Sequence, residues 1–148
     1  MKQVVDQFSR IVSLILADGS KSPLKLDVEE SVDNGKMQYT ITGSDESRTV
    51  IGTSEQGFFD ALRKLRLVLE RDKILLFCFG ASENVYPSGM QVSMGSCDLA
   101  YRTQIGKQAL REDIVSIFDA DDSLRPSTVE QQELFHTRWI ASLGQPER

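Results

Sequence analysis

The feature that most constrains the fold is a pair of alternating segments joined by a tight-turn sequence. Apolar residues alternate with charged or polar ones over 24–29 and again over 37–41, and Asp33-Asn34-Gly35 lies between the two segments. Strict alternation predicts strands that keep one face in water, and Asn-Gly favours a two-residue hairpin between them. With a further short strand at 49–51, these segments are expected to form an antiparallel meander.

The two ends of the chain are expected to be helical. Apolar residues recur at helical spacing over 4–15, and Asp18-Gly19 follows as a stop signal. Near the other end, Ser127-x-x-Glu130 has the pattern of a capping box, in which two side chains satisfy the free amides of a helix start. The apolar residues of 134–143 predict the packing stripe of that last helix.

A middle helix and an apolar run follow the meander. Thr53-x-x-Gln56 is a second capping-box pattern, and the helix it opens is expected to reach Arg71. A solvated outer face is the ordinary interpretation of its basic residues, Arg63, Lys64, Arg66 and Arg71. The run 74–79 has no polar residue and no alternation, which predicts a central strand covered on both faces.

These segments together predict one α+β domain over residues 1–148, with a largely antiparallel sheet covered by about three helices. Further strands are expected at 99–105 and 114–118, with a loop at 94–96. A chain of 148 residues can bury a core without a disulfide or a metal. The first residues do not resemble a secretory signal, and no apolar run is long enough for a membrane span, so the expected location is the cytoplasm.

The charge is mildly acidic but unevenly distributed. A net charge of −5 weighs against direct binding of nucleic acid or anionic membranes, which relies on basic surfaces. Seven acidic residues and one basic residue, Arg125, lie between Glu112 and Glu133, which gives this segment a net charge of −6. The rest of the chain is nearly neutral. Such a segment favours a basic protein partner if the fold gathers its acids on one side.

No motif for catalysis, metal binding or a cofactor stands out. Cys78 lies in an apolar run, where a buried and inert thiol is expected, and Cys97 lacks a local nucleophile motif. Neither the spacing of the cysteines and His136 nor the acids of 119–123 match a zinc or EF-hand site, so no metal and no cofactor are predicted. A small hydrolase that uses His136 with a carboxylate remains an alternative to a protein without enzymatic activity.

Several stretches of the C-terminal half carry a resemblance to a known class of proteins. They are Gly80-Ala-Ser-Glu-Asn-Val-Tyr-Pro-Ser-Gly-Met90, Ala100-Tyr-Arg102, Asp113-Ile-Val-Ser-Ile-Phe-Asp119, Thr128-Val-Glu-Gln-Gln132 and Trp139-Ile-Ala-Ser-Leu143. These stretches resemble small bacterial immunity proteins encoded beside polymorphic toxins, including those of contact-dependent inhibition and Rhs systems. The resemblance implies a protein that neutralises a cognate toxin by direct binding. Many such toxins are basic nucleases, so the resemblance also suits an acidic inhibitor.

The candidate partner-binding residues follow from the charge and from interface statistics. Asp119, Asp121 and Asp122 are the leading electrostatic contacts, and Glu112 and Asp113 extend the same acidic segment. Tyr86, in a loop of turn-forming residues, is a candidate aromatic anchor because interface hot spots favour tyrosine; packing against its own domain is the alternative. A small adaptor or chaperone-like protein, which would need a broad exposed apolar surface, is the rival binding function.

Overall fold

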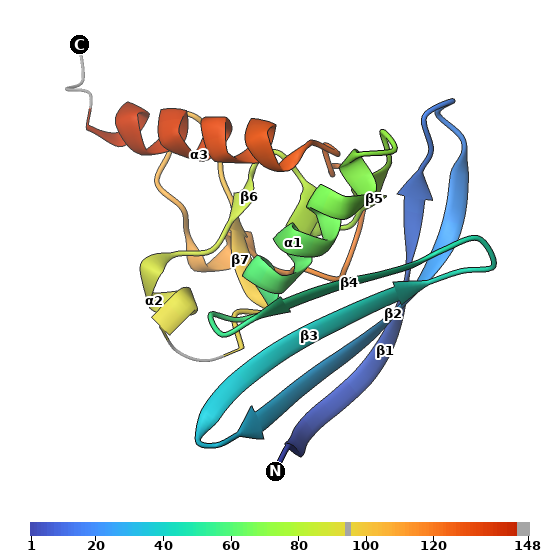
Figure 1. Ribbon diagram of the computed structural model, residues 1–148. Helices are drawn as coiled ribbons and strands as arrows, with labels where there is room; N and C mark the ends of the chain where they lie inside the picture. Colours follow the sequence, from blue (N-terminus) through green and yellow to red (C-terminus); the bar gives the residue numbers. More distant parts are fainter. Residues whose placement is uncertain (94–95, 145–148) are drawn as a thin grey trace.

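The computed structural model describes residues 1–93 and 96–144 (Figure 1). Within these residues the chain forms two antiparallel sheets and three α-helices, so the predicted α+β class is confirmed. The larger sheet contains β1 (Gln3–Ile15), β2 (Lys21–Asp33), β3 (Lys36–Ser44), β4 (Thr49–Ser54) and β5 (Leu75–Phe77) in the order β4-β3-β2-β1-β5. The smaller sheet contains β6 (Val85–Tyr86), β7 (Leu99–Arg102) and β8 (Ile114–Ser116), and the helices are α1 (Phe58–Glu70), α2 (Gly89–Ser93) and α3 (Val129–Leu143).

The meander predicted from alternation is confirmed. β2 pairs with β3 from Asp33↔Lys36 to Lys25↔Ser44, and β3 pairs with β4. Asn34 and Gly35 both have positive φ, 52° and 79°, as a turn that follows the twist of the two strands requires. The alternating apolar side chains of β2 and β3 are buried. Helix α1 covers the concave face of the sheet and packs against β3 and β4 (Figure 1).

The first element is a strand, and the predicted helix over 4–15 is wrong. β1 pairs with β2 along its length, from Gln3↔Val32 to Ile15↔Lys21. In this pairing Phe8, Val12 and Leu14 face the core, whereas Ile11 is 75% exposed, so the helical stripe was a coincidence of spacing. Because five of its thirteen residues are β-branched and a long partner strand is available, tertiary pairing decides its conformation.

Helix α1 lies on the concave face of the sheet and approaches it closely at Gly52. A Cβ at Gly52 would lie 2.0 Å from the carbonyl oxygen of Ala61, so only glycine permits this approach. The helix begins after Gly57, whose φ is 122°, and no side chain caps it. The capping box predicted at Thr53-x-x-Gln56 is therefore wrong. The backbone amide of Gln56 instead donates to Ser54 Oγ.

The apolar run 74–79 forms a short strand at the edge of the sheet. β5 pairs only with β1, at Ser13–Ile15, so the prediction of a central strand is wrong. Ile74, Leu76 and Cys78 are nevertheless buried. The chain then turns into the body of the domain through a single 3₁₀ turn at Phe79–Ala81.

Arg66 is buried, against the prediction that it belongs to a solvated basic face. Its side chain is 2% exposed, and it donates hydrogen bonds to the carbonyl oxygens of Gly80 and Ser127 and to Oε1 of Gln132. The Gln132 amide nitrogen in turn lies within 3.0 Å of the carbonyl oxygens of Gly80, Ser82 and Val85. This polar cluster joins α1, α3 and the chain between β5 and β6.

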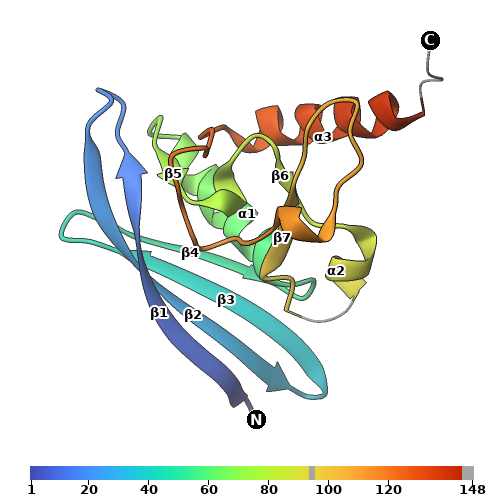
Figure 2. The same ribbon diagram turned by 180° about the vertical axis from the view of Figure 1, so that it is seen from behind.

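Helix α3 packs beside the smaller sheet, as Figure 2 shows from behind. Its capping box uses Thr128 and Gln131, one residue later than predicted. The predicted stripe is only partly right, since Phe135 is buried whereas Leu134, Ile140 and Leu143 are exposed. The strands predicted at 99–105 and 114–118 are present in shorter form as β7 and β8. The predicted loop at 94–96 lies mostly outside the described residues.

Candidate functional site

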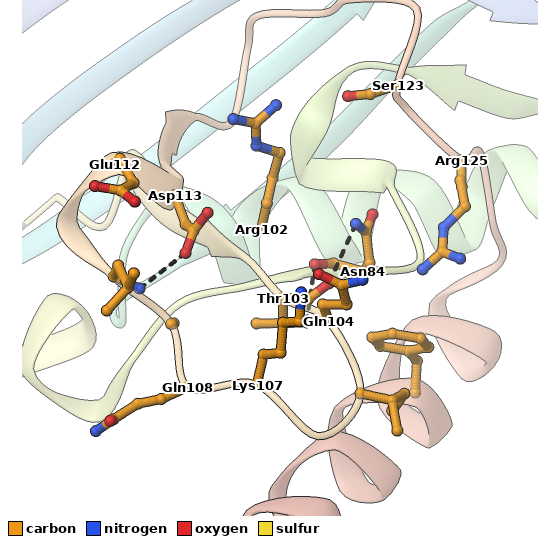
Figure 3. A pocket seen from close by; sticks show the side chains of 14 residues that line it. Asn84, Arg102, Thr103, Gln104, Lys107, Gln108, Glu112, Asp113, Ser123 and Arg125 are labelled. Carbon is orange, nitrogen blue, oxygen red and sulfur yellow. Dashed lines mark hydrogen bonds between the residues drawn. The ribbon is translucent and has the colours of Figure 1, made fainter.

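An open hollow of about 740 Å³ lies where β7, the chain from 103 to 113 and α3 meet (Figure 3). Its lining combines three cations, Arg102, Lys107 and Arg125, with two acids, Glu112 and Asp113. Ile105 and Leu110 also line it and are about half exposed, at 49% and 53%. The hollow is therefore a surface of mixed charge with accessible apolar groups, formed largely by one loop.

Hydrogen bonds to Asn84 and to helix α3 hold the loop from 103 to 113 in place. At its start the amide of Thr103 donates to the carbonyl oxygen of Asn84. In the middle, Trp139 Nε1 donates to the carbonyl oxygen of Lys107, and the Gly106 amide donates to Ser142 Oγ. These contacts fasten the loop to α3, so the lining residues have defined positions.

Glu112 and Asp113, two of the predicted partner-binding residues, line this hollow. The Asp113 carboxylate accepts a hydrogen bond from the Leu110 amide at 2.8 Å and closes the turn from 110 to 113, as Figure 3 shows. Asp113 therefore has a structural role, while the exposed Glu112 carboxylate is available to a partner.

Asp121 also borders the hollow, because its carboxylate lies 3.7 Å from Nη1 of Arg102, a lining residue. Hydrogen bonds from Ser123, with a smaller contribution from Arg102, hold the pKa of Asp121 below its usual range. Asp119 and Asp122 flank it in the same exposed loop. Four of the five predicted carboxylates are thus exposed, with Asp113 half-buried, and at least three of the five lie at the hollow.

The segment 112–133 is less acidic at its surface than its net charge suggests. The Glu133 carboxylate faces the domain, where it accepts hydrogen bonds from Arg63 and from the hydroxyl of Tyr86. Arg102, Lys107 and Arg125 add positive charge to the hollow. The sequence offered no motif for this basic contribution, because Arg102 and Lys107 lie outside the acidic segment and reach it only through the fold.

Tyr86 is half-buried and packs against its own domain. Its ring stacks on His136, with ring centres 3.7 Å apart, and meets the edge of Phe59 at 5.2 Å. Burial and the hydrogen bond to Glu133 both raise the pKa of Tyr86. It does not line the hollow that Glu112 and Asp113 line. A smaller recess of about 260 Å³ lies beside Tyr86, His136 and Trp139.

His136 lies between Tyr86 and Trp139 in an aromatic stack. Burial lowers its pKa, and the nearby Glu133 opposes that shift. Its buried Nδ1 has no hydrogen-bond partner among the described residues. Burial raises the pKa of both Cys78 and Cys97 to about 11, so both thiols are protonated near neutral pH and lack the thiolate that a nucleophile requires.

Comparison with known proteins adds no relative: no protein-family model matches the chain, and no curated protein is significantly similar to it. Among residues 1–93 and 96–144, no three His, Cys, Asp or Glu side chains are grouped as metal ligands would be. None of the helices in the same ranges has the length and apolar character needed to cross a membrane.

Proposed function

We propose that this protein binds and neutralises a cognate bacterial toxin, and that the hollow beside the 103–113 loop is the surface that docks it. The observation that carries the proposal is the combination, on one concave surface, of the exposed apolar Ile105 and Leu110 with the exposed carboxylate of Glu112. The resemblance of the C-terminal half to immunity proteins supports the same function.

The chemistry of this surface suits a protein partner. Protein interfaces combine apolar and polar groups, and here Ile105 and Leu110 line the same hollow as Glu112, Arg102 and Lys107. Asp119 and Asp122 are exposed in the adjoining loop, and their carboxylates would attract a toxin domain with a basic surface. A concave surface can also enclose a projecting loop or side chain of the toxin, which contributes affinity by excluding water.

Co-expression with the product of the neighbouring toxin gene tests the function. The proposal predicts that the two proteins co-purify and that this chain rescues growth of cells that express the toxin. Failure of both would overturn the function. Binding of many unrelated proteins with micromolar affinity would instead favour the adaptor alternative.

Two pairs of variants test the surface. Leu110→Asp and Glu112→Lys change the hollow, whereas Ile51→Asp and Glu46→Lys make the same chemical changes at exposed positions of β4 and of the turn before it. We expect each hollow variant to weaken toxin binding at least about tenfold, as loss of an interface anchor does, and each control to leave it unchanged. Equal effects of the hollow variants and their controls would show that the toxin docks elsewhere.

A further inference from the structure

One edge of the larger sheet is open over most of its length. β1 pairs with β2 from Gln3 to Ile15, but β5 covers its other edge only at Ser13–Ile15. Along residues 3–12 no strand of the described chain pairs with that edge, and Figures 1 and 2 both show β1 as the outermost strand near the N-terminus. The unpaired N–H and C=O groups of such an edge can pair with another strand.

Most side chains along residues 3–11 of this edge are exposed. Val5 is 56% exposed and Ile11 is 75% exposed, both unusually high for branched apolar residues in a strand. Phe8, between them, packs through its ring edge against Phe58 and Phe118 and is only partly buried. Covering this strand would therefore bury apolar surface on both sides of its midpoint.

Two charges on the edge lack an opposite charge within the domain. Neither Asp6 nor Arg10 forms an ion pair with any described residue, and four residue steps along the strand place them about 13 Å apart, too far to pair with each other. The Arg10 guanidinium rests over the Phe8 ring at 4.7 Å. Asp6 lies opposite Glu30 of β2, a like charge whose repulsion a cation on its open side would offset.

We propose that a second copy of this chain occupies the edge, with the two β1 strands antiparallel and related by a two-fold axis at Phe8. Asp6 of each copy then lies opposite Arg10 of the other, and Val5 opposite Ile11. Both unpaired charges gain a partner, and the exposed apolar residues cover each other. The two five-stranded sheets become one continuous sheet across the dimer.

The charges select this register over its neighbours. A shift of one residue in either direction places Asp6 opposite Ser9 or Ile11, and a shift of two places it opposite Phe8 or Val12. Of these five registers, only the one centred on Phe8 pairs unlike charges, and it does so twice because the two-fold axis repeats each contact. The β-bulge at Val5 and the pairing of β5 from Ser13 onward limit the regular part of the new ladder to about the five residues from Asp6 to Arg10, with Val5 and Ile11 at its ends.

Charge exchange provides a test with an internal rescue. Asp6→Arg places two arginines opposite each other at each contact, and Arg10→Asp places two aspartates there. The double variant Asp6→Arg/Arg10→Asp restores unlike pairs in the same register. An equimolar mixture of the two single variants restores them between different chains. Arg71→Asp and Asp72→Arg, at exposed positions after α1, are the matched controls.

Sedimentation velocity from 1 to 200 µM is the measurement. We expect the native chain to reach twice its 16.6 kDa mass. Each single variant should raise the dissociation constant about tenfold, since two attractive cross-strand pairs become repulsive. The double variant and the mixture should return to within about threefold of the native value, and the controls should not change it. Circular dichroism verifies that every variant is folded.

Three outcomes would overturn this dimer: a native chain that stays monomeric at 200 µM, single variants that dimerise as well as the native chain, or a double variant as weak as the singles. None of them bears on the proposed toxin binding, because the hollow and the β1 edge share no residue. A toxin-binding variant of the hollow should likewise leave the dissociation constant of the dimer unchanged.

Discussion

Replacement of Gln132 by methionine tests the buried polar cluster that joins the helices. Gln132 is fully buried, and methionine has nearly the same length and volume, so the change removes polar contacts without leaving a large cavity. The amide nitrogen carries two hydrogens and is surrounded by three carbonyl oxygens at 2.9–3.0 Å, so it contributes about two full hydrogen bonds. The amide oxygen accepts a third bond, from the charged Arg66 at 2.6 Å.

The magnitude follows from these bonds. A neutral hydrogen bond contributes about 1 kcal/mol and one to a charged group about 2 kcal/mol, so Gln132→Met should cost about 4 kcal/mol. With a slope of about 2 kcal/mol per molar urea, the midpoint of unfolding should fall by about 2 M. Urea unfolding followed by far-ultraviolet circular dichroism measures this shift.

The exposed Gln56 provides the control, since Gln56→Met should change stability by less than about 0.5 kcal/mol. A fall of less than about 0.5 M for Gln132→Met would refute the reasoning that the amide satisfies this cluster. Arg66→Met removes the donor of the hydrogen bond between Arg66 and Gln132, whereas Gln132→Met removes its acceptor. The double variant should therefore lose less than the sum of the two single losses.

Two further predictions concern close packing and pH. Gly52→Ala should cost about 3 kcal/mol in an unfolding experiment because its Cβ meets the Ala61 carbonyl, whereas Gly89→Ala, with open space around it, should cost little. His136 binds fewer protons in the folded state than in the unfolded state because burial lowers its pKa, so stability should decline as the pH falls below about 6.5. His136→Phe keeps an aromatic ring in the stack and should remove most of the pH dependence of the unfolding midpoint between pH 7.5 and 5.5. A pH dependence as steep as that of the native chain would contradict this assignment.

The strands that sequence reasoning located correctly are those whose signal is local. The Asn34-Gly35 turn and the alternation on either side of it belong to neighbouring residues, and β2 and β3 form where they predict. The helical spacing of 4–15 was equally local but wrong, because the partner strand that stabilises β1 contributes more than the periodicity of β1 itself. The start of α1 also depends on tertiary contacts, because the backbone amides of Phe58 and Phe59 donate to the carbonyl oxygens of Ser96 and Cys97.

The candidate site was only partly accessible to sequence reasoning. Net charge identified the segment of Glu112, Asp113 and Asp121, and these residues do lie at one hollow. It could not identify Arg102 and Lys107 as their neighbours, since tertiary contacts with Trp139 and Ser142 of α3 decide the path of the loop from 103 to 113. For Tyr86 the sequence left an interface anchor and packing against its own domain as alternatives, because its stacking partner, His136, lies fifty residues further along the chain.

The sequence by itself determined the α+β class, the central hairpin and the concentration of acidic residues near the C-terminal helix, because each depends on composition or on residues close together in the chain. Tertiary structure alone decided that 4–15 is a strand, that Arg66 is buried and that cations share the acidic surface. In each of these cases the deciding energy comes from residues outside the segment itself: a paired strand, three buried acceptors, or charges brought within a few ångströms by the fold.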